Sequence, residues 1–274
     1  MMLTMGSRIG FVAYRAVTCP LRMMPAFIVI GTHRGGTSAF YHYLTEHPGI
    51  GAATTKEVNY FDRNYFKGSL WYRAHFPTRA QRANRAAFIS GEASPHYLFH
   101  SLVPQRVAQT IPDVRLIVLL RNPVERAWSH YRRYIYLGRE TLPFEQAIAE
   151  EERRLTADAQ DTAGRTSYLA RGLYANQLDR WFSVFPRERL LILRSEDFYA
   201  DPAAILAQTL DYLDMPRDGM PEETTYDRYD GYAGTPVAHA DAAMSPASRT
   251  RLSAWFAPHN QRLYGLLERD MGWE

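Results

Sequence analysis

The chain has 274 residues, of which 46% are hydrophobic and 22% charged, and its formal net charge is +3 at pH 7. This composition excludes a disordered or fibrous chain, and the length allows one large α/β domain with a substantial core. The mild charge, without any run of four basic residues, does not indicate nucleic-acid binding. A single cysteine, Cys19, excludes an intrachain disulfide framework and a cysteine zinc site, and it is consistent with a cytoplasmic protein.

Residues 1–24 are expected to form an N-terminal extension that precedes the main domain at 25–274. Arg8, Arg15 and Arg22 recur every seven residues, with apolar residues between them. Two interpretations stay open for residues 8–22: a segment packed on the domain, which we favour, and a basic amphipathic helix in peripheral contact with a membrane. The apolar stretch is too short to span a bilayer, and it lacks the small-residue cleavage site of a signal peptide.

The chain is organised around residues 26–47, AFIVIGTHRGGTSAFYHYLTEH. The apolar run from Ala26 to Gly31 predicts a buried strand, and two further glycines, Gly35 and Gly36, predict a tight loop. From Thr37 the apolar spacing becomes that of a helix. A strand, a glycine-rich loop and a helix N-terminus form the geometry that cradles a phosphate group, and an ordinary turn between strand and helix is the alternative.

The cation in this loop is out of place for a nucleotide triphosphatase. That class needs a lysine directly after the last glycine, where this chain has Thr37, and the basic residue is Arg34 inside the loop. The shift favours a phosphate or phosphosulfate cradle that does not use a metal-bound triphosphate. The scattered histidines and acids show no metal-ligand spacing, so we predict that no metal takes part.

The rest of the chain predicts a single-domain α/β fold with a P-loop-type parallel sheet flanked by helices on both faces. Short strands are expected near 49–53, 88–92, 114–120 and 190–193, and helices over 102–110, 172–185 and 202–213. Residues 54–66 have no clean period and predict a structured loop, 214–244 predict one long loop, and 246–270 predict two short helices.

Residues 114–120 (VRLIVLL) form the strongest strand pattern, and Arg121 follows it directly. A magnesium-dependent triphosphatase places an acidic residue at such a strand end, whereas a cation suits a second anionic group. Ligands of open parallel sheets bind at the carboxyl ends of the strands, so Arg34 and Arg121 are predicted to face one crevice.

Several stretches together resemble the sulfotransferases that use 3′-phosphoadenosine 5′-phosphosulfate (PAPS), bacterial members in particular. They are GTHRGGTSAFYHYL, KEVNYFD, GEASP, RNPVERAWSHY, RGLYANQLDRWFSVFP, LLILRSEDF and APHNQRLY, and they cover nearly all of the chain from Pro25 to Trp273. KEVNYFD is closest to the heparan-sulfate-type carbohydrate branch. The resemblance implies transfer of the sulfuryl group of PAPS to an acceptor hydroxyl, with a carbohydrate, glycolipid or natural product as acceptor.

The resemblance also implies roles for single residues. Arg34, the backbone of Gly35–Thr37 and the hydroxyls of Thr37 and Ser38 are expected to hold the 5′ end of the donor, and Arg121 and Ser129 its 3′-phosphate. Glu57 is expected to be the general base, with Lys56 assisting Arg34 in stabilising charge on the leaving phosphate.

Three positions depart from the family pattern. Arg34 replaces a lysine, Asn59 stands where the heparan-type pattern has histidine, and Ala93 replaces the lysine of E-K-T-P. The late K-G-R signature is also missing. These changes are compatible with sulfuryl transfer. They do not support a heparan-like acceptor.

The acceptor side and the adenine site are less defined by the sequence. Asn59 and His96 are candidates for the acceptor side, with His96 also considered as an auxiliary base or a structural residue. Tyr229, with its neighbours Tyr226 and Tyr232, is a candidate to stack on adenine or on a sugar. Two other functions stay open, a small-molecule or nucleotide kinase and a nucleotide-binding protein without turnover.

Overall fold

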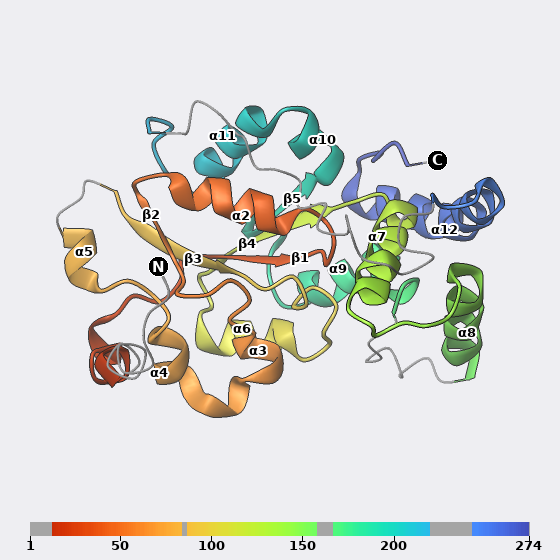
Figure 1. Ribbon diagram of the computed structural model, residues 1–274. Helices are drawn as coiled ribbons and strands as arrows, with labels where there is room; N and C mark the ends of the chain where they lie inside the picture. Colours follow the sequence, from red (N-terminus) through yellow and green to blue (C-terminus); the bar gives the residue numbers. More distant parts are fainter. Residues whose placement is uncertain (1–12, 84–86, 158–166, 220–242, 274) are drawn as a thin grey trace.

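Figure 1 shows the computed structural model, which describes residues 13–83, 87–157, 167–219 and 243–273. In these residues one parallel sheet has the strand order β2-β3-β1-β4-β5. The strands are β1 (Phe27–Gly31), β2 (Ile50–Ala52), β3 (Ile89–Ala93), β4 (Arg115–Leu120) and β5 (Leu190–Arg194). All four predicted short strands, and the strand at the start of the glycine-rich loop, are therefore confirmed.

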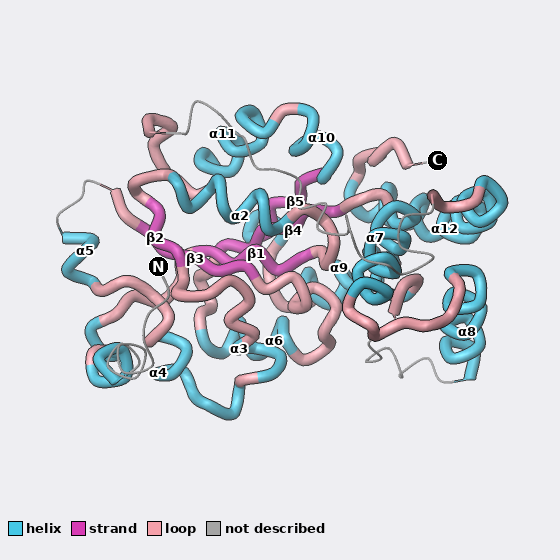
Figure 2. Tube along the Cα trace, in the orientation of Figure 1, coloured by secondary structure: helices cyan, strands magenta, loops and turns pink. Residues whose placement is uncertain are grey.

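Helices cover both faces of the sheet (Figure 2). The described helices are α2 (Thr37–Glu46), α3 (Tyr60–Arg63), α4 (Gly68–Arg73), α5 (Arg79–Ala83), α6 (Val103–Thr110), α7 (Pro123–Tyr136), α8 (Phe144–Ala157), α9 (Tyr174–Phe182), α10 (Ser195–Ala200), α11 (Pro202–Tyr212) and α12 (Pro246–Leu267). Short 3-10 turns lie at Cys19–Leu21 (η1), Tyr65–Lys67 (η2), Ala170–Gly172 (η3) and Arg187–Arg189 (η4).

Alternating side chains of the central strands divide the core into two layers. Phe27 and Val29 of β1 pack with α2, α10 and α11 on one face. Ile28 and Ile30 pack with α3, α4, α6 and α9 on the other. Since successive side chains of a strand point to opposite faces, a continuous apolar run is what a sheet buried on both sides requires. The predicted α/β architecture with helices on both faces is confirmed.

A third apolar cluster lies beyond the sheet and joins α7, α8 and the first half of α12. Its members include Ala127 of α7, Ile148 of α8 and Phe256 of α12, all nearly inaccessible to solvent. In Figure 1 these three helices form the right-hand part of the molecule. The cluster fixes α7 beside the carboxyl ends of the strands.

The described part of the N-terminal extension packs on the domain. Arg15 donates to the carbonyl oxygens of Ala74 (2.5 Å) and Phe76 (2.8 Å), and Arg22 donates to that of Phe76 (2.9 Å). Arg8 lies outside the described residues. None of the described helices is long and apolar enough to cross a bilayer.

Two predictions about regular structure are wrong. Residues 246–267 form one helix of 22 residues rather than two short ones, although Pro258 removes one backbone donor. The helix stays continuous because Phe256 packs into the third cluster and Leu263 into the sheet core, so burial on both sides of the proline holds it. In the predicted loop at 54–66, residues Tyr60–Arg63 form the short helix α3.

Candidate active site

A cleft of about 1310 Å³ opens at the carboxyl ends of the strands, and nearly all of the predicted site residues that the structure describes line it. Glu57 follows β2, His96 follows β3, Arg34 follows β1 and Arg121 follows β4. In the strand order these residues succeed one another across the sheet, so the sheet places the carboxylate, the imidazole and the two cations in that order along one edge. The prediction that Arg34 and Arg121 face one crevice is confirmed.

A smaller pocket of about 490 Å³ lies at the opposite ends of the strands, where Pro25, Asp113 and Leu213 contribute to its wall. It contains none of the predicted site residues. The candidate active site is therefore the larger cleft.

The loop after β1 is held in an unusual backbone conformation. Arg34 has φ 71° and Gly36 has φ 87°, in the left-handed region that favours glycine. The backbone N–H of Gly35 donates to the carbonyl of Thr32 (2.9 Å), and the Gly35 carbonyl accepts from the Ser195 hydroxyl (2.5 Å). Gly35 itself does not line the cleft, and its N–H forms a hydrogen bond within the loop.

The N-terminus of α2 points its first residues at the cleft. Gly36, Thr37 and Ser38 line the wall, with Ser38 exposed and the side chain of Thr37 buried. The first backbone N–H groups of a helix have no partner within the helix and carry a partial positive charge. This end of α2 therefore offers donors to an anionic group without needing a lysine.

Arg34, Ser129 and Arg121 form one connected group. Nε of Arg34 donates to the hydroxyl of Ser129 (3.0 Å), and Nη1 of Arg121 donates to the carbonyl of Arg34 (3.2 Å). The Arg121 carbonyl accepts from the hydroxyl of Tyr174 (2.8 Å), a residue buried on α9. The two predicted anion sites are thus joined through the Arg34 backbone and side chain.

The first backbone N–H groups of α7 already have a hydrogen-bond partner in the preceding residue of the chain. The side chain of Asn122 accepts from the backbone N–H groups of Val124 (2.9 Å) and Glu125 (3.4 Å), and Pro123 occupies the first helical turn. Because the Asn122 cap uses these amides, an anion at the start of α7 would be bound by the side chains of Arg121 and Ser129.

Lys56 and Glu57 project from the loop after β2. Their side chains are 3.2 Å apart, from Nζ to Oε1, and 27% and 49% exposed. The backbone N–H of Glu57 donates to the carbonyl of Ala93 (3.0 Å), which ties this loop to the end of β3. Asn59 donates from Nδ2 to the Glu57 carbonyl (3.0 Å), and both residues have positive φ, 51° and 62°. Asn59 thus shapes the loop besides lining the cleft.

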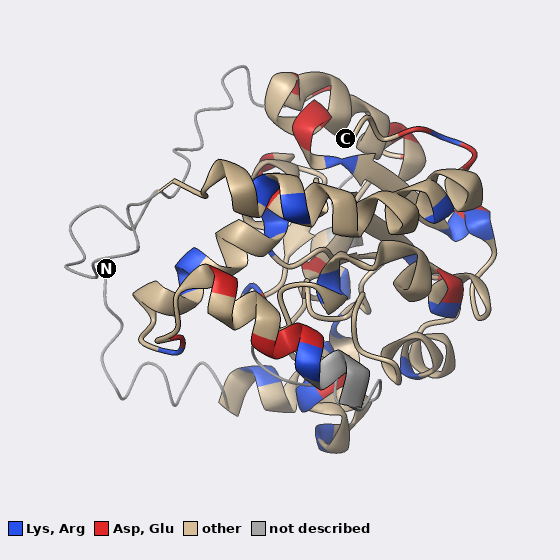
Figure 3. Ribbon diagram, turned by 90° about the vertical axis from the view of Figure 1, so that its right-hand side faces the viewer, with Lys and Arg blue, Asp and Glu red and all other residues tan. Residues whose placement is uncertain are grey.

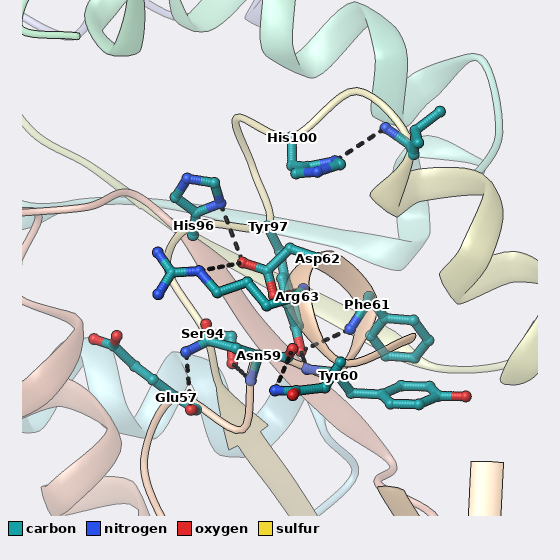
Figure 4. A network of polar contacts seen from close by, with 12 residues as sticks. Glu57, Asn59, Tyr60, Phe61, Asp62, Arg63, Ser94, His96, Tyr97 and His100 are labelled. Atoms are coloured by element: carbon teal, nitrogen blue, oxygen red, sulfur yellow. Dashed lines mark hydrogen bonds and ion pairs between the residues drawn. The ribbon is translucent and has the colours of Figure 1, made fainter. Parts of the chain in front are cut away.

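A buried carboxylate, that of Glu92, is connected to this loop through Ser94, whose contact with the backbone of Asn59 is drawn in Figure 4. Glu92 accepts from the hydroxyls of Tyr72 (2.6 Å), Ser94 (2.7 Å) and Tyr97 (3.2 Å), and Ser94 in turn accepts from the backbone of Asn59 (3.2 Å). Burial raises the pKa of Glu92 to about 7, against the opposing effect of these hydrogen bonds. The sequence interpretation did not assign Glu92, although it stands in the quoted GEASP stretch.

Sequence reasoning also missed Asp62, which lies in the quoted KEVNYFD stretch. Its side chain is 1% exposed, and its Oδ2 lies 3.2 Å from Nδ1 of His96, a residue that lines the cleft (Figure 4). The spacing of Asp62 within this stretch does not predict its contact with His96, which lies 34 residues further along the chain.

Arg171 is a third missed residue, from the quoted RGLYANQLDRWFSVFP stretch. It is 5% exposed, lines the cleft, and lies over the ring of Phe99 at 4.4 Å. Burial, and then the charge of Arg126, lowers its pKa to about 10, so it stays charged at neutral pH. Its Nε has no hydrogen-bond partner among the described residues.

Beneath the loop, the rings of His33 and His130 meet edge to face at 4.7 Å. Burial, with nearby charges that include Arg171, holds the pKa of each histidine well below its usual value. Both rings are therefore neutral, and the positive charge of this region comes from the arginines.

The cleft is markedly basic. The lining contains three glutamates, of which Glu125 pairs with Arg249. Figure 3 views the molecule from the side of α7, α8 and α12, where Lys and Arg lie on several elements with acidic residues interspersed. The basic residues of the lining are Arg34, Lys56, Arg63, Arg121, Arg132, Arg133, Arg139, Arg171 and Arg249. Such a lining suits an anionic ligand.

Tyr229 lies outside the described residues, as does most of the predicted loop at 214–244. In the described ranges no group of three or more His, Cys, Asp or Glu is arranged to hold a metal ion, and a metal-free reaction stays a prediction.

The fold and the site define an α/β group-transfer enzyme that binds an anionic nucleotide at the ends of a parallel sheet. The chain belongs to the sulfotransferase domain family, whose model matches residues 24–231. The prediction of a sulfotransferase is thereby confirmed.

Two similar proteins have comparable identity to this chain. Heparan sulfate glucosamine 3-O-sulfotransferase 6 of Mus musculus is 29% identical over 267 residues, which cover 92% of this chain and 75% of that protein. A sulfotransferase structure from Alicyclobacillus acidocaldarius is 29% identical with a TM-score of 0.72, covering 90% of this chain and 97% of the other. A mouse sulfotransferase complexed with PAP shares the fold at 12% identity and a TM-score of 0.50, covering 91% of this chain and 90% of the other.

Proposed function

We propose that this sulfotransferase moves the sulfuryl group of PAPS to a hydroxyl of a carbohydrate or glycolipid, with Glu57 as the general base. The proposal is supported by the spatial order in which the predicted site residues lie along the edge of the sheet. Arg34 and Arg121 follow the adjacent strands β1 and β4, whereas Glu57 and His96 follow β2 and β3. The cleft thus has two neighbouring halves: a donor half at the ends of β1 and β4, and an acceptor half at the ends of β2 and β3.

The residues of the donor half fit a nucleotide with two anionic groups. The N-terminus of α2 and Arg34 suit the 5′ group, while Arg121 and Ser129 suit the 3′-phosphate. PAPS supplies an activated sulfuryl group attached to its 5′-phosphate. Arg34, assisted by Lys56, stabilises the negative charge that the 5′-phosphate gains as the sulfuryl group leaves.

The residues of the acceptor half fit the removal of a proton. Sulfuryl transfer resembles phosphoryl transfer, in which the protein mainly aligns the reactants and stabilises charge. The acceptor hydroxyl loses its proton as its oxygen bonds to sulfur, and the Glu57 carboxylate takes that proton. Lys56, with Nζ 3.2 Å from this carboxylate, forms an ion pair that orients it.

A carbohydrate acceptor is supported by the KEVNYFD stretch and by the glucosamine sulfotransferase that is 29% identical to this chain. Asn59 and Ala93 depart from the heparan-type pattern on the acceptor side, so we do not extend the proposal to heparan sulfate. A glycolipid acceptor would agree with peripheral membrane contact of residues 8–22: although Arg15 and Arg22 hold the described part of this segment on the domain, Val17 (81% exposed) and Leu21 (64% exposed) leave apolar surface there.

The donor is tested by thermal unfolding and by calorimetric titration without added Mg²⁺. Adenosine 3′,5′-bisphosphate, the product left by PAPS, is expected to stabilise the protein more than AMP or ATP, because only it satisfies both anion sites. Each tenfold difference in affinity corresponds to about 1.4 kcal/mol. Equal shifts with AMP, which lacks the 3′-phosphate, contradict the assignment of Arg121 and Ser129. The acceptor is then sought by following transfer from PAPS to a panel of glycans, glycolipids and phenols.

A further inference from the structure

The contact between Asp62 and His96 joins a buried carboxylate to an imidazole in the cleft wall. Oδ2 of Asp62 lies 3.2 Å from Nδ1 of His96, and both atoms are inaccessible to solvent. The two atoms are within ion-pair distance, though not aligned as a linear hydrogen bond. The His96 side chain is 26% exposed and lines the cleft. Because Nδ1 is the covered nitrogen, the exposed side of the ring carries Nε2.

The carboxylate determines which nitrogen of His96 carries the proton. Burial opposes the charge of Asp62, but its contact with His96 and the hydrogen bond from the Arg63 backbone together keep its pKa below the usual value. An ionised carboxylate only accepts hydrogen bonds. A proton on Nδ1 of His96 avoids two facing lone pairs across the 3.2 Å contact with Asp62, and it leaves the lone pair of Nε2 toward the cleft.

The surroundings of His96 keep the ring neutral. Burial lowers the pKa of His96, and the charges of Arg171 and Arg63 lower it further against the opposing effect of Asp62. His100 on the same loop lies edge-on at 6.1 Å, and burial lowers its pKa as well. At neutral pH the ring thus has an acceptor nitrogen in a cleft otherwise lined by many donors.

The sequence pattern gives this arrangement a context. In KEVNYFD, Asn59 stands where the heparan-type pattern has histidine, and the Asn59 side-chain amide donates to the Glu57 carbonyl. His96 places an imidazole on the neighbouring loop, after β3 rather than β2, within the same acceptor half of the cleft. Asp62 belongs to the KEVNYFD stretch itself, so one loop orients the ring that the other carries.

We propose that Nε2 of His96 accepts a hydrogen bond from a hydroxyl of the acceptor, and that Asp62 is the positioning residue that holds His96 in the Nδ1–H tautomer. The inference rests on the proposed function, since it assigns an acceptor contact in the same cleft. It adds a specificity determinant to Glu57: an acceptor needs a hydroxyl donor at Nε2 in addition to the hydroxyl that is sulfated.

Asp62→Asn is a sharp test because the second carboxylate oxygen is already used. Oδ1 of Asp62 accepts from the backbone N–H of Arg63 (2.8 Å). An asparagine that keeps this bond through its carbonyl oxygen presents its amide N–H₂ to Nδ1 of His96. The ring must then carry its proton on Nε2, which turns the acceptor nitrogen in the cleft into a donor.

The tautomer is measured by nitrogen-15 NMR of the histidine side chains at neutral pH, with His96→Asn used to assign the resonances. We expect Nδ1–H for His96 in the unchanged protein and Nε2–H in Asp62→Asn. This readout requires no acceptor and no turnover, so it separates a failure of the inference from a failure of the proposed function. An Nε2–H tautomer in the unchanged protein overturns the inference.

The acceptor contact is measured with the first panel member that the enzyme sulfates. His96→Asn keeps a donor for Asp62 but removes Nε2, and it is expected to raise the acceptor KM about 5- to 10-fold with the affinity for adenosine 3′,5′-bisphosphate unchanged. Asp62→Asn is expected to raise the same KM at least about tenfold. His42→Asn, on the exposed face of α2, is the control. Wild-type KM values in both variants contradict the contact.

Discussion

Nε of Arg34 donates to the hydroxyl of Ser129 across 3.0 Å, which joins the loop after β1 to the second turn of α7. These two residues were predicted to hold opposite ends of the donor, the 5′ group and the 3′-phosphate. Their contact means that Ser129 belongs to both proposed sites: its hydroxyl accepts from the Arg34 guanidinium and lies on the wall of the cleft. Loss of this hydroxyl is therefore expected to affect the whole nucleotide.

Arg121→Ala and Ser129→Ala are expected to weaken binding of adenosine 3′,5′-bisphosphate to different degrees. A hydrogen bond to a charged group contributes roughly 1.5–3 kcal/mol and a neutral one about 1, so the arginine variant should lose about 10- to 100-fold and the serine variant less. Calorimetric titration at constant salt measures both, with the exposed Ser101→Ala as the control. If neither variant changes the affinity, the 3′-phosphate is bound elsewhere.

Glu57→Gln is expected to abolish most turnover and leave nucleotide binding intact. Glutamine keeps the size and a hydrogen-bonding group but does not take the proton of the acceptor hydroxyl, so the rate should fall by about 10²-fold or more. The affinity for adenosine 3′,5′-bisphosphate should stay within about twofold, because the carboxylate lies in the acceptor half. Steady-state rates with a working acceptor and calorimetry measure the two effects.

The exposed Glu188→Gln is the matched control for this variant. The pH–rate profile of Glu57→Gln should also lose its acidic limb. Undiminished turnover in Glu57→Gln would show that another group is the base.

Glu92→Gln is expected to change how stability depends on pH. Burial raises the folded-state pKa of Glu92 to about 7 from its ordinary value of 4.5, so between these values the folded protein keeps a proton that the unfolded chain releases. This contribution to stability is present at low pH and is lost as pH rises through about 7, and it is on the order of 3 kcal/mol at about 1.4 kcal/mol per pKa unit.

Urea unfolding between about pH 5 and pH 8 measures this effect as the difference between the two proteins. The unchanged protein should lose more stability over this interval than Glu92→Gln. Glu151 is also buried with a raised pKa, but it is present in both proteins and cancels from the difference. Parallel stability curves would contradict the raised pKa of Glu92.

Gly36→Ala is expected to destabilise the loop that ends at α2. Gly36 has φ 87°, and an added Cβ would lie 2.8 Å from the hydroxyl of Tyr199. The left-handed conformation costs a residue with a Cβ about 1–2 kcal/mol, and each kcal/mol lowers the melting temperature of a chain of this size by about 2–4 °C. The affinity for adenosine 3′,5′-bisphosphate should fall as well, because the loop lines its site.

Gly265→Ala is the control for this prediction, since Gly265 lies in α12 and an added Cβ meets nothing within 4 Å beyond its chain neighbours and the backbone of its own helix. Alanine there should stabilise the protein by up to about 1 kcal/mol. Calorimetric melting of both variants provides the measurement. The expectation fails if the two substitutions shift the melting temperature in the same direction.

The sequence by itself determined the strands, the loop after Ala26–Gly31 and the two cations at strand ends. These features are local: an apolar run predicts a buried strand, glycines predict a tight loop, and a parallel sheet gathers its carboxyl ends on one edge. Arg34 and Arg121 were therefore placed in one crevice from their positions in the chain alone. The family resemblance added the roles of Glu57 and Ser129.

Only the tertiary structure decided which side chains meet. The contact of Asp62 with His96, the hydrogen bond of Arg34 to Ser129 and the burial of Glu92 depend on the strand order β2-β3-β1-β4-β5 and on helices packed from distant parts of the chain. The continuity of α12 through Pro258 likewise depends on the two apolar clusters that it joins. Local periodicity contains no information on such contacts, because they are selected by burial and pairing between segments that are far apart in the sequence.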